Sequence, residues 1–189
     1  MTSRIVSVLI GYLFGNFQSS YILVKAFRNK DIRDIGSHNA GTMNTTLNEG
    51  IGLGTATFSL DVIKTVLASY LSLYLFKDTL SRELVLSYAC LGTALGHEFP
   101  FWLKFRGGKG VAVALAFLLI FDYRILLMTI VVTLIVLAVT RRLWLGSTAI
   151  SVMMSLGAFC LYSVEVGIVV TIQAAWIVIL HLVHLKDDG

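Results

Sequence analysis

The chain has 189 residues, of which 57% are hydrophobic and 14% charged, and its formal net charge at pH 7 is +4. Soluble domains are about 45–50% apolar and about 25% charged. This composition therefore excludes an ordinary soluble domain and indicates an integral membrane protein, whose main solvent is lipid.

Apolar segments recur along the whole chain. They lie near residues 4–26, 51–76, 84–103, 111–123, 125–139, 147–162 and 164–184. The first lacks the short core and small-residue cleavage pattern of a signal peptide, so we expect it to remain as the first span. The fourth and fifth fit either one kinked element or two short spans hinged around residues 122–124, and we expect two.

These segments, with no long linker and no repeat, predict a single domain over residues 1–189. The expected fold is an all-α integral membrane protein of about seven transmembrane helices. Seven spans place most of the 15 lysines and arginines on one side, which the positive-inside rule makes cytoplasmic, with the N-terminus outside and the C-terminus inside. Segments 31–50, 96–110 and 140–148 then share the cytoplasmic face, where we expect the functional site.

Segment 96–110 combines glycines with three cations, Lys104, Arg106 and Lys109, directly before an apolar helix. Glycine backbone can form a concave nest of N–H groups for an anion, especially where a helix begins. The amide groups assigned to such a phosphate cradle are those of Gly107, Gly108 and Gly110. The spacing is not that of a P-loop, which disfavours a mononucleotide hydrolase. The alternative is that the cations only anchor the loop to anionic lipid headgroups.

Segment 36–50 offers neutral hydrogen-bonding groups suited to a hydroxylated, phosphorylated small molecule, among them Ser37, Asn39 and Asn44. The same residue types also occur in any loop. Within the second apolar segment, Asp61 and Lys64 stand three residues apart, on one helical face and able to pair. Ionisable residues inside a span are costly, so we expect a functional pair, with a structural ion pair as the alternative.

His97 follows Gly96 near a break in the third span and is a candidate general base or phosphate donor. A structural hydrogen bond is the alternative. No metal-ligand spacing is present, so the sequence predicts neither a metal nor a cofactor, and we expect no nucleic-acid partner.

These motifs carry a family resemblance. GHEFPFWLKFRGGKGVA (96–112) resembles the GHxFPxFLxFKGGKGVAT motif of the PlsY family, the acyl-phosphate:glycerol-3-phosphate acyltransferases of bacterial membranes. Four further matches follow in the same order as in that family: GYLFGNFQSSYILVK (11–25), GSHNAGTMN (36–44), DVIK (61–64) and TRRLWLGS (140–147). The resemblance covers most of the chain.

The resemblance implies a seven-span protein of the bacterial cytoplasmic membrane, embedded in lipid, with its site on the cytoplasmic face. It also implies transfer of a fatty acyl group from acyl phosphate, not acyl-CoA, to the 1-hydroxyl of glycerol 3-phosphate. The products are lysophosphatidate, a phospholipid precursor, and phosphate. Such an activated donor needs little beyond alignment and charge stabilisation.

From the motifs and the resemblance together, we assign roles to individual residues. Those assigned to catalysis are His97, Lys109 and Ser37. Those assigned to substrate and phosphate binding are Asn39, Asn44, Asp61, Lys64, Lys104, Arg106, Gly107, Gly108, Gly110 and Ser147.

The chain also departs from the family pattern. Leu47 stands in place of an arginine, Trp144 in place of a serine, and the ending HLVHLKDDG lacks the expected asparagine and arginine. Three hypotheses follow: an active acyltransferase with an altered acceptor pocket, a weak or inactive paralogue that binds phospholipid precursors or regulates a partner, and a small-anion transporter. Transporters usually have internal repeats and polar sites near the bilayer midplane, which disfavours the third.

Overall fold

The computed structural model describes the backbone of residues 1–187 and the side chains of residues 1–183. The regular elements of this part are all helical, which confirms the predicted fold class. In chain order they are α1 (Thr2–Gly15), α2 (Ser19–Arg28), the 3-10 turn η1 (Ile32–Asp34), α3 (Thr42–Glu49), α4 (Ile51–Phe76), α5 (Arg82–Glu98), the 3-10 turn η2 (Phe101–Leu103), α6 (Val111–Phe121), α7 (Tyr123–Thr140), α8 (Leu143–Leu161) and α9 (Val164–Asp187).

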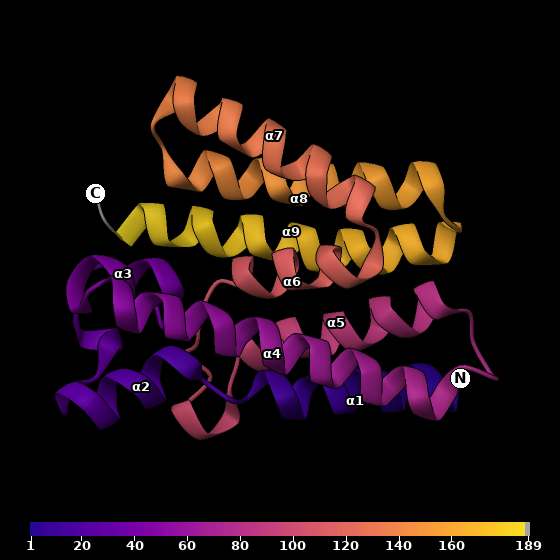
Figure 1. Cartoon of the computed structure of the whole chain (residues 1–189), viewed down its shortest axis with the longest axis horizontal. Coiled ribbons are helices and arrows are strands. Elements are labelled where there is room, and N and C mark those ends of the chain that lie inside the picture. The colour runs from indigo at the N-terminus through magenta and orange to yellow at the C-terminus, as the bar shows by residue number, and fades with distance from the viewer. Residues whose placement is uncertain (188–189) are drawn as a thin grey trace.

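The helices form two layers with α6 between them (Figure 1). One layer contains α1 to α5, and the other contains α7 to α9. The chain begins at one end of the bundle and finishes at the other, and the connections before α4, between α5 and α6, and between α7 and α8 lie toward the C-terminal end. The three polar segments thus gather at one end of the molecule.

Five helical stretches in the described residues are long and apolar enough to cross a membrane. They are Thr2–Arg28, Ile51–Phe76, Tyr123–Thr140, Leu143–Leu161 and Val164–Val183. The predicted division of residues 111–139 into two helices is confirmed, because the chain is extended at Asp122. The predicted break of the third apolar segment near Pro100 is confirmed, since α5 stops at Glu98. Helix α8 begins at Leu143, four residues earlier than expected.

Helix α6 is the centre of the apolar core. Its 11 residues are apolar throughout, so it has no polar face, and all of them except Leu119 are buried or partly buried. Val113, Phe117 and Leu118 are fully buried, and they belong to one cluster with Met154 of α8 and Ile177 of α9. The helix is only about 16 Å long, about half the hydrocarbon thickness of a bilayer. Both of its ends therefore lie in recesses of the bundle.

Helices α1 and α5 approach so closely that only glycine fits between their backbones. A Cβ atom on Gly11 or Gly15 of α1 would overlap backbone atoms of α5, and one on Gly92 or Gly96 of α5 would overlap backbone atoms of α1. Each pair has the small-x-x-x-small spacing that lets two helices meet backbone to backbone. This contact fixes the depth at which the end of α5 meets the end of α1.

Replacing Gly92 by alanine tests this contact, because the new Cβ would overlap Val8 across the interface. We expect Gly92→Ala to lower the free energy of unfolding by about 1–3 kcal/mol, as overpacking does. The measurement is the thermal unfolding midpoint in detergent, followed by tryptophan fluorescence. Gly52→Ala is the matched control: Gly52 is exposed, nothing lies within 4 Å of its Cβ position, and the midpoint should not fall. An equal fall in both variants would contradict the interpretation.

Candidate functional site

The first apolar segment is broken in the middle, and the break holds the end of α5. Between α1 and α2 the chain leaves the helix at residues 16–18. The Asn16 side chain accepts from Phe101 N at 3.0 Å, and the Trp102 indole donates to Asn16 O at 2.8 Å. The buried Gln18 amide donates to His97 O at 2.9 Å. Polar groups of this break therefore position the residues that follow α5.

A buried cluster of three ionisable groups lies beside this break. Lys64 Nζ is 2.7 Å from Asp61 Oδ1 and 2.8 Å from His97 Nδ1, and the predicted Asp61–Lys64 pair is thereby confirmed. The three residues are only 1–4% exposed. Lys64 also donates to Phe17 O at 2.8 Å, and the Ser19 hydroxyl donates to Asp61 Oδ1 at the same distance. Helices α1, α2, α4 and α5 thus converge on one charged pair.

The cluster fixes the direction of the His97 ring. A lysine ammonium group only donates hydrogen bonds, so Nδ1 of His97 accepts, and in the neutral ring the proton is on Nε2. Nε2 lies against Gly108, where a Cβ atom would overlap it. The imidazole N–H is therefore directed from the buried ion pair toward the glycine loop.

The glycine loop, residues 104–110, folds back onto the end of α5. Gly107 N donates to Glu98 O and Gly108 N to His97 O, both at 3.0 Å. The sequence assigns these two amide groups to a phosphate cradle, but in the structure they are already engaged within the protein. Gly110 has φ +79° and precedes α6 without a side-chain cap, so the first N–H groups of α6 lack intrahelical partners. The anion-binding capacity of the loop is thus concentrated at the α6 N-terminus.

The three cations of the loop differ in exposure. Lys104 and Arg106 are exposed, whereas Lys109, next to the start of α6, is partly buried. Lys104 and Phe105 both have left-handed φ values near +57° and +59°, which turn the chain sharply before the glycines. The loop therefore presents positive charge from its surface down to the helix N-terminus.

The segment before α4 packs against this loop. Ala40 N donates to Gly107 O at 3.4 Å, and Arg33 donates to Leu103 O at 2.9 Å. Arg33 also pairs with Asp31 at 2.7 Å, and this guanidinium holds the pKa of the Asp31 carboxyl below its ordinary value. The pair thus remains charged at neutral pH and holds the Arg33 guanidinium where it bonds to Leu103 O of the other segment.

The polar residues predicted in segment 36–50 have different environments. Asn44 is buried and donates to three carbonyl groups, Ile32 O, Ile35 O and Asn39 O, at 2.9–3.1 Å. Its side-chain oxygen accepts from Ser37 N at 3.1 Å. Asn44 therefore holds the shape of the loop, while Ser37 is exposed and Asn39 partly exposed. Residues 42–49 form helix α3, where we had expected a loop.

The predicted residue Ser147 lies apart from this assembly. It is in the second turn of α8, and its hydroxyl donates to Leu143 O at 3.2 Å within the same helix. Among the described residues, no hydrogen bond joins it to the loop or to segment 31–41. Its assignment to the site stays a prediction.

The sequence alone did not single out Gln18, Ser19 and Glu98. Glu98 is buried under Gly110, and Glu98 Oε1 and Gln18 Oε1 have no hydrogen-bond partner among the described residues. Buried polar atoms are normally paired, so these two oxygens are exceptions in the packed region around His97. A signal was available for Gln18 and Ser19, because the polar run NFQSS interrupts an otherwise apolar segment.

An apolar groove leads from the membrane-facing surface to the charged cluster. It has a volume of about 460 Å³ and runs between α1 and α4. Its lining residues are Leu13, Phe14, Phe17, Leu60, Ile63, Lys64 and Leu67. Lys64 thus belongs both to the buried ion pair and to the wall of a groove that is otherwise apolar.

The described residues contain no set of metal ligands. No group of three or more histidine, cysteine, aspartate and glutamate side chains there could hold a metal ion.

The known proteins that match this chain belong to one family. The sequence model of the glycerol-3-phosphate acyltransferase family matches residues 5–187. Glycerol-3-phosphate acyltransferase 1 of Lactobacillus acidophilus is 35% identical over 167 residues, which are 88% of this chain and 79% of the relative. Glycerol-3-phosphate acyltransferase of a Thermoanaerobacter species is 32% identical over 183 residues, covering 96% and 90%.

A solved structure is similar over nearly the whole chain. The crystal structure of PlsY, an integral membrane glycerol 3-phosphate acyltransferase, in its glycerol 3-phosphate form superimposes with a TM-score of 0.85. The sequence identity is 26%, and the superposition covers 97% of this chain and 90% of the other. The helical architecture described above is therefore shared with an integral membrane protein.

The buried ion pair gives a testable expectation. Asp61→Asn and Lys64→Met each leave one buried charge without its partner, and each should lower the free energy of unfolding by about 3–5 kcal/mol. The double variant removes both charges, so its loss should be clearly smaller than the sum of the two. The measurement is a thermal or denaturant unfolding cycle of the four proteins in one detergent. Additive losses would show that the two side chains are not energetically coupled.

Proposed function

This chain belongs to the glycerol-3-phosphate acyltransferase family, and we propose that it transfers a fatty acyl group from acyl phosphate to the 1-hydroxyl of glycerol 3-phosphate. The observation that carries this proposal is the convergence of three features at one end of the bundle: the cationic glycine loop, the buried cluster around His97, and the apolar groove that ends at Lys64. Together they suit an amphiphile with a phosphate at one end.

The phosphate end of the donor is assigned to the start of α6. A helix N-terminus attracts anions through its unpaired N–H groups and its dipole. Lys109 stands one residue before the N-cap Gly110, and Lys104 and Arg106 add positive charge at the surface. These groups stabilise the phosphate as negative charge develops on it during departure.

The reaction needs little further chemistry. The acceptor hydroxyl oxygen forms a bond to the acyl carbon, the bond from that carbon to the phosphate oxygen breaks, and phosphate leaves. The hydroxyl proton passes to a phosphate oxygen of a substrate, so no protein base is required. The Nε2–H group of His97 is directed toward the loop and serves to orient a substrate oxygen there. Catalysis then rests on alignment and charge stabilisation.

The acceptor is assigned to the polar segment that packs against the loop. Ser37 and Asn39 are accessible, and the buried Asn44 holds their backbone in place. Leu47, where the family pattern has an arginine, is 71% exposed on α3. We therefore propose an acceptor pocket that differs from the family pattern on this side. The side chains of residues 184–189, where the pattern also departs, lie outside the described residues.

The apolar groove between α1 and α4 is assigned to the acyl chain. Leu13, Phe17, Ile63 and Leu67 are 43–67% exposed along its length, so a chain there passes from lipid to the charged cluster without crossing polar surface. We place the protein, a multi-pass membrane protein, in the bacterial cytoplasmic membrane with the loop end facing the cytoplasm. That orientation agrees with the charge bias of its loops.

Turnover of acyl phosphate tests the proposed activity. Purified protein should form lysophosphatidate and one equivalent of phosphate from acyl phosphate and glycerol 3-phosphate, detected by mass spectrometry and a phosphate assay, and acyl-CoA should not replace the donor. Lys109→Ala should lower kcat at least about 100-fold, as loss of a transition-state charge contact does. Lys77→Ala, at the other end of the bundle, is the control and should be fully active. Thermal stabilisation by the substrates without turnover would favour a paralogue that only binds them. The absence of both binding and product would contradict the proposal.

Narrowing the groove tests the acyl-chain assignment. Leu67→Trp fills the part of the groove farther from the loop, so it should impair long acyl phosphates more than short ones. The tryptophan side chain displaces about two methylene groups of a long acyl chain. The kcat/KM for palmitoyl phosphate, divided by the kcat/KM for octanoyl phosphate, should therefore fall about tenfold. Leu134→Trp on α7 is the control, because Leu134 is similarly exposed and lies away from the groove. An unchanged ratio in Leu67→Trp would place the chain elsewhere.

A further inference from the structure

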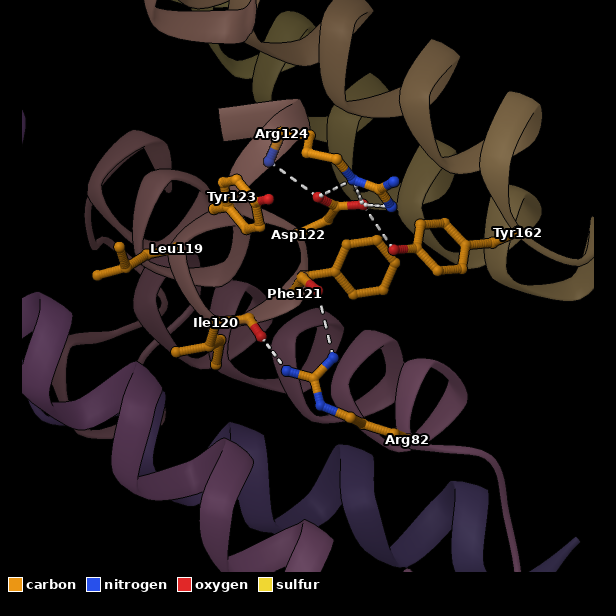
Figure 2. A pocket seen from close by; sticks show the side chains of 8 residues that line it. All are labelled: Arg82, Leu119, Ile120, Phe121, Asp122, Tyr123, Arg124 and Tyr162. Atoms are coloured by element: carbon orange, nitrogen blue, oxygen red, sulfur yellow. Dashed lines mark hydrogen bonds and ion pairs between the residues drawn. The ribbon is translucent and has the colours of Figure 1, made fainter. Parts of the chain in front are cut away.

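A second pocket lies at the opposite end of the bundle, where α6 ends and α7 begins (Figure 2). Its volume is about 410 Å³. The residues that line it are Arg82, Leu119, Ile120, Phe121, Asp122, Tyr123, Arg124 and Tyr162. None of these residues belongs to the site described above, so the proposed acyl transfer does not explain the pocket, which we call the arginine pocket.

Arg82 and Arg124 enter the arginine pocket from different helices. Figure 2 shows Arg82 approaching from the start of α5 and Arg124 from the first turn of α7. Arg82 donates to the carbonyl groups of Ile120 and Phe121, at the C-terminal end of α6. Arg124 makes a two-pronged bond to Asp122, the N-cap of α7, with contacts of 2.7 and 3.1 Å. The pocket is thus built by defined contacts, which hold both guanidinium groups at its wall.

The charge of the pocket is positive. Two arginines face one carboxylate, and Asp122 is already engaged by Arg124 and by the Tyr162 hydroxyl at 2.7 Å. The bonds of Arg82 use its two terminal nitrogens and leave Nε able to donate, while Arg124 retains Nη1. An anion with several acceptor oxygens fits these remaining donors, because guanidinium groups match the geometry of phosphate.

Part of the rim of the pocket is apolar. Leu119 is 54% and Tyr123 is 66% exposed, beside the charged groups. The pocket lies at the level where its neighbouring helices end, because Arg82 begins α5, Tyr123 begins α7 and Tyr162 caps α8. Lipid headgroups at the bilayer surface lie at such helix ends. The neighbouring apolar side chains favour a ligand with acyl chains over a free anion.

We propose that the arginine pocket binds the phosphate group of an anionic phospholipid from the leaflet opposite the glycine loop. The phosphate lies between Arg82 and Arg124, and the glycerol and the first methylene groups lie along Leu119 and Tyr123. The binding is independent of the acyl-transfer reaction and of its substrates.

The test compares the protein in nanodiscs of pure phosphatidylcholine with discs containing increasing phosphatidylglycerol. Wild type should show a saturable rise in thermal unfolding midpoint and should retain phosphatidylglycerol in native mass spectrometry. Arg82→Gln and Arg124→Gln should each weaken apparent affinity about fivefold, the effect of one basic residue near anionic lipid. Lys77→Gln removes one positive charge at the C-cap of α4, a helix that ends at the same end of the bundle, and Lys77 does not line the pocket. This variant should bind as wild type does.

The other outcomes overturn the proposal. Equal weakening in Lys77→Gln would mean that only general surface charge acts. The proposed acyl-transfer site also binds glycerol 3-phosphate, so soluble glycerol phosphate is compared between wild type and Arg124→Gln. Stabilisation by soluble glycerol phosphate that is lost in Arg124→Gln would identify a free phosphate as the ligand of the pocket. Because Arg82 also caps α6, its variant can be less stable in phosphatidylcholine alone. Arg124→Gln, whose parent side chain is 61% exposed, then decides: unchanged affinity in this variant contradicts the assignment.

Discussion

The structure depends on the close contact between the backbones of α1 and α5. Glycines at matching positions on both helices leave no room for a Cβ atom, so the two helices cross at one fixed depth. That depth brings the break after α1 next to the end of α5, where Gln18 bonds to His97 O and Lys64 bonds to Phe17 O. A residue larger than glycine in the contact would push the helices apart and break both hydrogen bonds.

The buried ion pair then turns this packing into a site. A charged lysine in a bundle core is tolerated only where its donors are satisfied, and Lys64 uses Asp61, His97 and a carbonyl of the α1–α2 break. The same contacts prevent the His97 ring from rotating. The groups that neutralise Lys64 therefore also direct the imidazole toward the glycine loop.

Sequence reasoning succeeded where the physics is local. A span must satisfy its own backbone hydrogen bonds, so apolar length predicts helices, and spacing of three residues predicts the Asp61–Lys64 pair. It failed where partners are distant in the chain. The sequence around Ser19 does not predict its hydrogen bond to Asp61, which is 42 residues away. The glycine motif likewise does not predict that two of its amide groups bond to carbonyl groups at the end of α5. The α1–α5 contact could have been found, because the spacing of its four glycines is visible in the sequence.

Helix α6 is short, and a recess lies at each of its ends. The glycine loop lies at its N-terminus and the arginine pocket at its C-terminus, which places two positively charged recesses on opposite sides of one short helix. Two such recesses facing each other would suit an anion pathway if the space between them were open. Here it is filled, because Val113, Ala114, Phe117 and Leu118 are fully buried and pack into the central apolar cluster. An anion passing along α6 would have to displace this core and shed its hydration in an apolar medium, at a cost of many kcal/mol. The filled core between the two recesses therefore separates them, and they are not the mouths of a channel.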